Sequence, residues 1–494
     1  MRIRPWLVPA LLLLCVTLPH LTDGDWQRGD SGWYTAIGVQ AFRTGEFWTL
    51  IGEPGQPYFN KPPLVFWITG LIAWVFGPGA LAARGPTVLA ALGCVLVTVS
   101  IVREFGNRRA ALASGIALAL SLEFFRRTRE VSLDMWQTLF LLLALWAVAI
   151  GVTRGRWKMF ALAGVPLGLA LLCKPLVAMV GVGAIVVWLI SLGQYRRLWW
   201  AAVMTLVALL VAGPWHVSMA LLHGEAFTSQ YFGDQIMSRA GGANITSSTG
   251  LFFYIEQLFR NHWPWLVFVA LRILALVRAG GRARLTRSHR QCMGLALAWT
   301  VVWFVALSVF ADRRDRYGLV MQPGLAILAG VWLGVLAPRW FARFNRMLVR
   351  VGVPVACAGA ALFAILPVRV HKPVNPQWPA LFAWMETHKD LLDTDGTARE
   401  GAGRNGLWQG GFRGDHGSRL YLETGFWPIT TMSRNGDIVA TPPAGSLIIY
   451  HRRGGLRPGE NESVVFTSGD LTVTELIHGD WSPIEFADPG EGGG

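Results

Sequence analysis

Residues 131–152 read VSLDMWQTLFLLLALWAVAIGV, an almost uninterrupted apolar run with one acidic residue, Asp134, near its start. A helix needs about 20 apolar residues to cross the hydrocarbon core of a bilayer. The length of this run therefore predicts a membrane-spanning helix. The whole chain has the same character, because 53% of its residues are hydrophobic and only 15% are charged. This balance is far from that of a typical water-soluble protein and predicts a polytopic, all-α membrane protein.

Further apolar runs predict a membrane domain over residues 1–367, followed by a separate domain over residues 368–494. The runs suggest about eleven spans, at about residues 5–21, 80–102, 110–125, 131–152, 159–173, 175–192, 198–221, 264–277, 291–310, 317–337 and 347–366. The C-terminal domain is expected to be a small soluble α/β or α+β domain. Its expected elements are a helix near 379–392 and strands at 419–422, 447–450, 464–466 and 471–477.

Two long loops are expected on the outer side of the membrane, at residues 22–79 and 222–262. In the first loop, Tyr34, Ile37, Ala41 and Phe42 recur at helical spacing, which indicates an amphipathic helix lying in the interface. In the second loop, residues 233–250 are rich in Gly, Ser and Asn. This composition is typical of a mobile segment such as a lid.

Basic residues set the expected orientation. Under the positive-inside rule, the Arg-rich loops, such as residues 278–290, lie in the cytoplasm together with the N-terminus. The C-terminal domain then lies on the outer side of the membrane. The net charge of +14 is explained by this topology and by anionic lipid headgroups, so it does not indicate nucleic-acid binding. All five cysteines fall within predicted spans, and no disulfide framework or Cys-based zinc site is expected.

Several cations break this rule at the outer ends of the predicted spans. They are Lys61, Lys174, the cluster Arg126, Arg127 and Arg129, and the cluster Arg313, Arg314 and Arg316. Together they indicate an anionic partner at the outer surface. The alternative for any single arginine is that it reaches toward lipid headgroups.

Two carboxylates, Asp30 and Asp134, lie near the same boundary. A carboxylate beside an apolar run is energetically costly unless it forms an ion pair or has a function. The alternative for each of the two is that it caps the start of a helix. Tyr34 and Tyr317 are either hydrogen-bonding residues or ordinary interfacial aromatics. The outer loops contain no close cluster of His, Asp and Glu, so no metal is predicted.

The order of these residues resembles the GT-C polyprenyl-phosphate-sugar glycosyltransferases. The resemblance is greatest to the bacterial lipid A aminoarabinose transferases and more distant to the protein O-mannosyltransferases. It covers about residues 30–338. The positions that carry it are Asp30 with Tyr34, Lys61-Pro62-Pro63-Leu64 followed by Trp67, Ala83-Arg84, Asp134, Lys174-Pro175, Phe253-Tyr254 to Pro264-Trp265, and Arg316-Tyr317 with Pro323. The resemblance implies an enzyme that takes a sugar from a lipid-linked monophosphate on the non-cytoplasmic face.

Chemistry and resemblance together suggest a role for each candidate. Asp30 is expected to be the catalytic base, and Asp134 to orient Lys61 or the acceptor. The cations expected to bind the donor phosphate are Lys61, Lys174, Arg316 and Arg127. Tyr34, Tyr317 and Asn60 are expected to contact the substrate. Because phosphate is the leaving group, no general acid is needed, and a single displacement inverts the anomeric centre. No cofactor is expected to be required.

The sequence also departs from the family pattern. Ser31 follows Asp30 where relatives commonly carry a second acid, and Trp33 stands where many have a basic residue. The sugar and the acceptor, whether a lipid A-type lipid, a glycan or a protein, therefore stay open. A transporter or flippase of the same lipid is the alternative, but it predicts charged or broken helices at mid-membrane depth. A structural or sensory protein would leave Asp30, Lys61, Asp134 and Lys174 unexplained.

Overall fold

The computed structural model describes most of the chain from Trp6 to Glu485. The described ranges are 6–27, 29–53, 56–237, 252–278, 286–310, 313–335, 358, 362, 374–388, 407–410, 419, 421–422, 429–430, 442, 446–451, 456–468, 471–477 and 484–485. These residues belong to two compact units. The first unit, here the helical unit, comprises Met1–Leu21, Phe59–Val65 and Arg84–Val368. The second unit comprises Thr22–Tyr58, Phe66–Ala83 and Arg369–Gly494.

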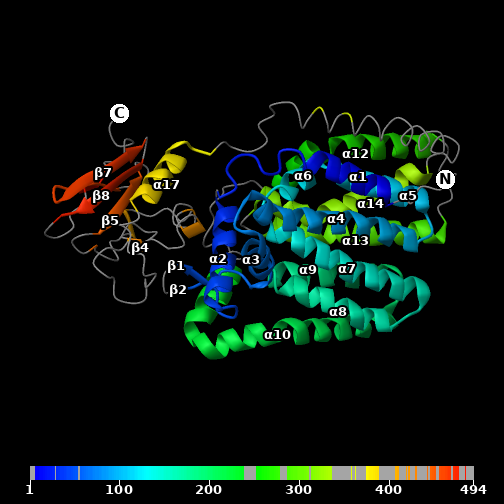
Figure 1. Cartoon of the computed structure of the whole chain (residues 1–494). Coiled ribbons are helices and arrows are strands. Elements are labelled where there is room, and N and C mark those ends of the chain that lie inside the picture. Colours follow the sequence, from blue (N-terminus) through cyan, green and yellow to red (C-terminus); the bar gives the residue numbers. More distant parts are fainter. Residues whose placement is uncertain are drawn as a thin grey trace, which may run out of the picture. The chain divides into compact units, whose positions relative to one another are not determined.

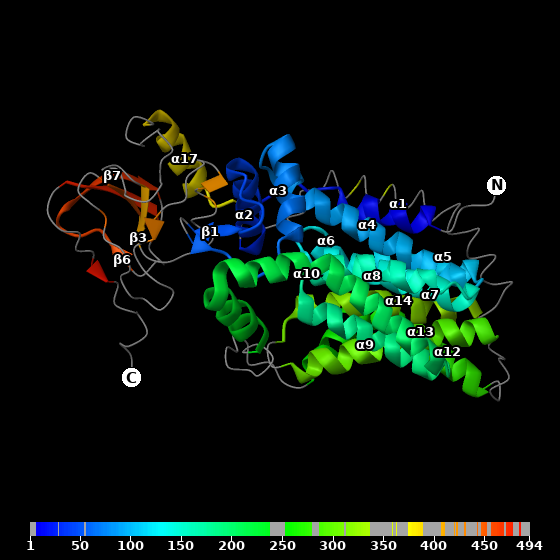
Figure 2. The same ribbon diagram turned by 90° about the horizontal axis from the view of Figure 1, so that it is seen from below.

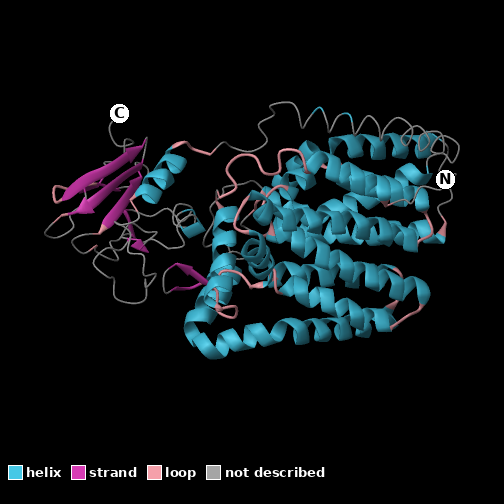
Figure 3. Ribbon diagram, in the orientation of Figure 1, coloured by secondary structure: helices cyan, strands magenta, loops and turns pink. Residues whose placement is uncertain are grey.

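The helical unit is built from helices, most of them apolar; helices are drawn in cyan in Figure 3. They are α1 (Leu7–Thr17), α4 (Ala80–Glu104), α5 (Arg108–Ala119), α6 (Leu122–Thr128), α7 (Leu133–Arg154), α8 (Lys158–Leu171), α9 (Pro175–Ser191), η1 (Tyr195–Arg197), α10 (Leu198–Thr228), η2 (Ser229–Met237), α12 (Phe253–Arg278), α13 (Arg287–Val309), η3 (Asp315–Met321) and α14 (Gln322–Val335). The prediction of a mostly helical protein is confirmed.

Among the described residues, four helical segments are long and apolar enough to cross a membrane. They are Ala80–Glu104, Leu133–Arg154, Tyr195–Gly233 and Arg287–Val309. Other apolar helices, such as Lys158–Leu171 and Pro175–Ser191, are shorter. The count of eleven spans stays a prediction, and the expected span at 347–366 lies largely outside the described residues.

Helices α7, α8 and α10 pack side by side, with α8 in contact with both of the others (Figures 1 and 2). Two glycines allow α8 to approach α10 closely. A Cβ atom on Gly164 would lie 2.5 Å from the carbonyl oxygen of Met204, and one on Gly168 would lie 2.8 Å from that of Ala208. Membrane helices commonly use small residues for such backbone contacts. Substituting either glycine would therefore force the two helices apart.

The second expected outer loop is helical where the structure describes it. Helix α10 continues to Thr228, and the π-helix η2 follows directly. Aromatic burial stabilises this extension, because the rings of Phe227 and Tyr231 stack 4.8 Å apart and both pack edge-on against Trp215. The chain turns at Gly224, whose φ of 51° is readily adopted only by glycine. Most of the predicted lid at 233–250 lies outside the described residues.

The N-terminal part of the second unit contains two helices. The helix predicted in this segment is confirmed as α2 (Asp30–Thr44), and its place in the membrane interface stays a prediction. Helix α3 (Leu64–Phe76), which begins in the helical unit, was not predicted, although its sequence LVFWITGLIAWVF is entirely apolar apart from one threonine and one glycine. The two helices touch at glycines, because a Cβ atom on Gly70 would lie 2.3 Å from the carbonyl oxygen of Gly38. A short hairpin, β1 (Ile51–Glu53) and β2 (Gln56–Pro57), follows α2.

The C-terminal part of the second unit is a mixed sheet with a helix on one face. The sheet has the order β4-β3-β5-β8-β7, with strands at Leu407–Gly410 (β3), Ile429–Thr430 (β4), Leu447–His451 (β5), Glu462–Ser468 (β7) and Leu471–Leu476 (β8). Strand β3 runs parallel to β4 and β5, whereas β8 is antiparallel to β5 and β7. A separate pair joins β6 (Leu456–Arg457) to β9 (Ile484–Glu485). The apolar core lies between this sheet and α17 (Gln377–Thr387).

Three of the four predicted C-terminal strands are confirmed, as β5, β7 and β8, and α17 confirms the predicted helix. The predicted strand at 419–422 is wrong, because Arg419, Tyr421 and Leu422 are helical. All three side chains are buried. One face of a helical turn accommodates this spacing, whereas a half-buried strand would expose one of two adjacent residues.

Candidate active site

The N-terminal ends of α7 and α9 carry an ion pair. Lys174 immediately precedes Pro175, the first residue of α9, and its Nζ lies 2.5 Å from Oδ1 of Asp134. Both side chains are about one-seventh exposed, at 14% and 15%. The side-chain amide of Gln137 also donates to the Lys174 carbonyl at 2.8 Å. Helix α7 therefore holds both the ammonium group and the backbone carbonyl of Lys174.

Asp134 is not the cap of α7. The cap is Ser132, whose hydroxyl accepts from the Met135 amide at 3.2 Å. Asp134 lies in the first turn, where a carboxylate interacts favourably with the helix dipole. Its ion-pair partner is Lys174, and the expected role of Asp134 in orienting Lys61 or the acceptor stays a prediction. A lysine fixed by a carboxylate in this way has a defined position and keeps its remaining donors for a ligand.

The aromatic ring of Tyr317 has two cations close to it. Nζ of Lys174 is 5.1 Å from the ring centroid, and the guanidinium carbon of Arg316 is 5.9 Å from it. Both distances are within the range of about 6 Å for cation–π attraction. The structure thus brings together four predicted residues from three distant segments: Asp134, Lys174, Arg316 and Tyr317. Their formal charges sum to a positive value, which suits an anion.

The segment that carries Lys61 also belongs to the helical unit. The amide of Leu64 donates to the carbonyl of Leu172 at 3.4 Å, two residues before Lys174. Asn60 accepts at its side-chain oxygen from Gln230 of η2 at 3.2 Å. Lys61 is half-buried. These contacts tie the Lys61 segment both to the turn that carries Lys174 and to η2.

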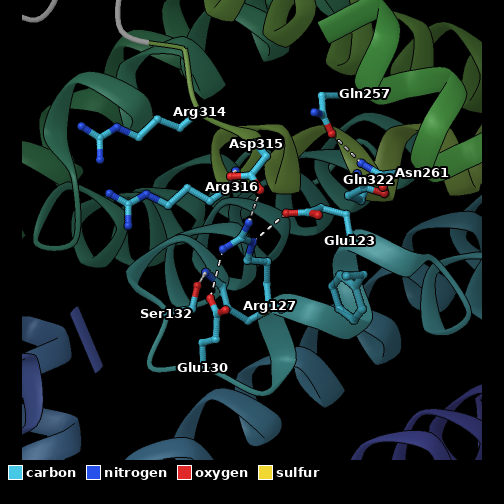
Figure 4. A network of polar contacts seen from close by, with 12 residues as sticks. Glu123, Arg127, Glu130, Ser132, Gln257, Asn261, Arg314, Asp315, Arg316 and Gln322 are labelled. Atoms are coloured by element: carbon cyan, nitrogen blue, oxygen red, sulfur yellow. Dashed lines mark hydrogen bonds and ion pairs between the residues drawn. The ribbon is translucent and has the colours of Figure 1, made fainter. Parts of the chain in front are cut away.

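Arg127 is the centre of an ion network, shown in Figure 4. Its Nε lies 2.6 Å from Glu123, its Nη1 3.0 Å from Glu130, and its Nη2 2.8 Å from Asp315. Burial by itself lowers the pKa of the Arg127 guanidinium, but the three carboxylates more than offset this and raise the pKa above its ordinary value. A phosphate would have to displace one of these carboxylates. The geometry therefore favours a structural role for Arg127 over the predicted phosphate contact.

Asp315 extends this network to the cations around Tyr317. One carboxylate oxygen of Asp315 accepts from Arg127, and the other accepts from the backbone amide of Arg316 at 2.7 Å. Arg127 thus tethers α6 to the start of η3.

Replacing Arg127 by methionine is expected to lower the thermal stability of the purified protein. The substitution strands the carboxylate of Glu123, whose side chain is only 2% exposed. Removing one partner of a buried ion pair costs about 3–5 kcal/mol. Thermal unfolding in detergent measures the loss, and adding Glu123→Gln to the variant should restore much of it. Equal melting temperatures for Arg127→Met and the unsubstituted protein would contradict the tether.

Arg129 is also satisfied inside the protein. Its guanidinium is buried and donates to the carbonyls of Thr17 and Pro19, at 2.6 Å each. Basic groups at a helix C-terminus satisfy its free carbonyls and interact favourably with the dipole. Arg126, by contrast, is exposed. Of the three arginines expected to meet an outer anion, two therefore have internal partners.

Asp30 and Tyr34 belong to the second unit. Asp30 is exposed and is the first residue of α2, after an N-cap glycine, Gly29, with φ of 57°. It is thus in the first helical turn and not at the cap position. Tyr34 is buried, with its ring 5.1 Å from that of Phe66 in an edge-on contact. This contact packs the ring against α3.

Sequence reasoning missed the residues that hold the site together. Gln137, Gln230 and Asp315 had no signal that tied them to a function. Glu123 had one, because it precedes Arg127 by four residues and such pairs meet on a helix surface. Within the described part of the chain, no group of three or more His, Cys, Asp and Glu side chains is placed to hold a metal.

Known proteins with a similar sequence or fold include several sugar transferases. A family model for dolichyl-phosphate-mannose-protein mannosyltransferases matches residues 60–218, a stretch that contains Lys61, Asp134 and Lys174. ArnT from Cupriavidus metallidurans, solved bound to undecaprenyl phosphate, superposes with a TM-score of 0.72 at 18% identity, over 96% of this chain and 97% of that one. This chain has the GT-C fold. The archaeal oligosaccharyltransferase AglB from Archaeoglobus fulgidus is a more distant structural relative, with a TM-score of 0.54 and 13% identity over 91% of this chain and 69% of that one.

Sequence relatives agree with the fold. The undecaprenyl phosphate-alpha-4-amino-4-deoxy-L-arabinose arabinosyl transferase of Edwardsiella ictaluri is 25% identical over 66% of this chain and 59% of its own length. The enzyme of the same name from Erwinia tasmaniensis is 28% identical over 68% of this chain and 60% of its own length. The chain thus matches about three fifths of these relatives. The resemblance to polyprenyl-phosphate-sugar glycosyltransferases is confirmed, and the protein is a multi-pass membrane protein.

Proposed function

We propose that this protein is a membrane glycosyltransferase that moves a sugar from a polyprenyl-phosphate donor to an acceptor on the outer face of the bacterial inner membrane. The observation that carries the proposal is the cationic cluster around Tyr317. Lys174, fixed by Asp134, and Arg316 both lie within about 6 Å of the centroid of this ring. The Lys61 segment is hydrogen-bonded to the turn that carries Lys174. This is a preorganised anion site within a GT-C fold.

The chemistry requires a site for developing negative charge. As the bond between the anomeric carbon and the phosphate oxygen breaks, polyprenyl phosphate leaves as an anion. Positive groups fixed in advance stabilise this charge in the transition state. Lys61 and Lys174 supply point charges, and Arg316 supplies a bidentate donor. A bond forms from the acceptor oxygen to the anomeric carbon, with inversion.

We assign the acceptor proton to Asp30. General bases are often carboxylates, and Asp30 lies exposed in the first turn of α2. Asp134 positions Lys174. Tyr317 and Asn60 are proposed substrate contacts. Tyr34, a buried ring, is proposed to support α2 from behind.

The named relatives use an aminoarabinose donor, and the structural relative was solved with undecaprenyl phosphate. These facts support a polyprenyl-phosphate sugar as the donor class. The sugar and the acceptor are left open, because Ser31 and Trp33 depart from the family pattern near Asp30.

The test is sugar transfer by the purified protein in detergent. Polyprenyl-phosphate sugars are incubated with lipid A-type, glycan and peptide acceptors, and products are identified by mass spectrometry. Release of polyprenyl phosphate with a glycosylated acceptor of inverted configuration is expected. A transporter would instead carry the intact donor between the leaflets of vesicles and leave its sugar in place. That outcome would overturn the proposal.

Orientation is tested separately with reporters. A reporter fused after Gly494 is expected to be active only outside the cytoplasm, because the positive-inside rule and an odd number of spans place the C-terminal domain there. A reporter inserted within residues 282–290 is expected to be active only in the cytoplasm. An outside signal from residues 282–290 would reverse the proposed topology.

We expect transfer to proceed without a divalent metal ion. The fixed cations already provide positive charge to the leaving phosphate, so a metal has no separate task there. Activity should be unchanged in excess chelator and on addition of magnesium or manganese. Complete loss on chelation, with recovery on adding metal, would mean that carboxylates such as Asp30 and Asp134 bind a cation. Asp30 would then no longer be assigned as a free base.

A further inference from the structure

The turn that leads into α2 is anchored to the C-terminal segment of the second unit. Asp25, five residues before Asp30, uses both carboxylate oxygens. Oδ1 accepts from the backbone amide of Gln27 at 3.2 Å, and Oδ2 accepts from Nη2 of Arg419 at 2.6 Å. The ion pair joins residues that are 394 positions apart in the sequence. The approach to α2 is thus held by a residue from the C-terminal part of the second unit.

Arg419 is itself fixed in the core of the C-terminal part. Its side chain is 4% exposed, and its guanidinium carbon lies 4.9 Å from the ring centroid of Trp378 on α17. Trp378 belongs to the apolar cluster that α17 forms with β5 and β8. A buried guanidinium needs a partner to offset its desolvation. The carboxylate of Asp25 provides that partner.

The same segment also packs against α2. Tyr421 and Leu422 lie in one apolar cluster with Ala36 and Val39 of that helix. The guanidinium carbon of Arg43, near the end of α2, is 5.4 Å from the Tyr421 ring centroid. Burial raises the pKa of Tyr421, and Arg43 opposes this rise. Contacts with residues 419–422 therefore hold both the approach to α2 and its apolar face.

Gln27 is in close contact with the first turn of α2. A Cβ atom on Gly32 would lie 1.9 Å from the carbonyl oxygen of Gln27, so residue 27 packs directly against the first turn of the helix. Gln27 is 5% exposed. A displacement of Asp25 would move Gln27, and Gln27 cannot move without disturbing the turn that bears Asp30.

We propose that Arg419 is a positioning residue for Asp30. Through Asp25, the C-terminal domain holds the turn at residues 25–32 and so fixes where the carboxylate of Asp30 lies. This gives the C-terminal domain a part in the transfer reaction without contact with substrate. The naming of Asp30 as base rests on the proposed function, whereas the anchoring of the turn does not.

The test compares Arg419→Gln, Asp25→Asn and the double variant with a matched control. The control is Tyr450→Phe, which removes a buried hydrogen bond from Tyr450 to Glu462 at 2.6 Å within the same domain. Arg419→Lys keeps the positive charge and serves as the conservative variant. Backbone hydrogen exchange of residues 25–36 reports on the turn in the full-length protein, and steady-state kinetics report on transfer.

Faster exchange of residues 25–36 is expected in Arg419→Gln and Asp25→Asn but not in Tyr450→Phe. Turnover should fall about 10-fold or more, because small misplacements of a catalytic group are costly, while KM for the donor changes little. The double variant should be no slower than the slower single variant, since both residues act through one contact. Arg419→Lys should recover part of the rate.

Combining Arg419→Gln with Asp30→Asn decides whether the effect acts through Asp30. If it does, Arg419→Gln should not slow the Asp30→Asn protein further. An equal slowing in that background, unchanged exchange of residues 25–36, or the same loss in Tyr450→Phe would overturn the inference. A starting protein that transfers no sugar would overturn the proposed function instead, and the exchange data would still show whether Arg419 anchors the turn.

Discussion

Asp30→Asn is expected to lower the turnover number for sugar transfer about 100-fold or more, the usual scale for removing a general base. Asparagine keeps the size of the side chain and a hydrogen-bonding oxygen, but it cannot accept the acceptor's proton. Asp30 is exposed in the first turn of α2. Its replacement should therefore leave folding almost unchanged, since a carboxylate at this position contributes only about 0.3–1 kcal/mol.

Turnover numbers and melting temperatures of the purified proteins check this expectation. The matched control is Glu46→Gln, which removes an exposed carboxylate just after the other end of α2. The control should transfer sugar at the unsubstituted rate. If Asp30→Asn stays within a few-fold of that rate, Asp30 stabilises the helix start and is not the base.

Lys61→Ala is expected to remove most transfer activity, by about 100-fold, comparable with the loss of one donor from a site of developing charge. The lysine is half-buried in a segment joined by backbone and side-chain contacts at Leu64 and Asn60. Those contacts do not depend on the ammonium group. The segment should therefore keep its position, and the loss should appear in kcat/KM for the donor.

Lys61→Arg should retain part of the activity, because it keeps the charge with a different geometry. Lys158→Ala provides the control, since Lys158 is an exposed basic residue at the start of α8, with its Nζ 5.8 Å from the Trp157 ring centroid. Steady-state kinetics with a polyprenyl-phosphate sugar compare the three variants. Normal turnover of Lys61→Ala would remove Lys61 from the phosphate site.

The fold could be predicted where it depends on local properties. The run at 131–152 predicted α7 because its length matches a bilayer, and the spacing of Tyr34 and Ile37 predicted α2. Helix α3 was overlooked, although Leu64–Phe76 is just as apolar, because it follows a diproline within a segment interpreted as a loop. The prediction of a strand at 419–422 was wrong. The conformation there depends on burial against residues that are distant in the sequence, and not on an alternation of apolar and polar residues.

The candidate site could be predicted as a set of residues but not as a set of contacts. Lys174 and Asp134 were both chosen as candidates, yet their pairing across 40 positions depends on how α7, α8 and α9 pack. Arg127 was expected to bind phosphate because its sequence neighbours are cations. In the structure, Asp315, which is far away in the sequence, completes its set of partners.

The sequence by itself determined that this is a helical membrane protein with cations near the ends of several apolar segments, because hydrophobic length and charge are properties of the chain. Only the tertiary structure decided which groups surround each cation. Arg127 pairs with carboxylates of the protein and Arg129 donates to its carbonyls. Lys174 and Arg316, in contrast, lie close to the ring of Tyr317. The physical reason is that the energy of an ion pair depends on the distance between the two charges in space. Separation along the chain does not reveal that distance.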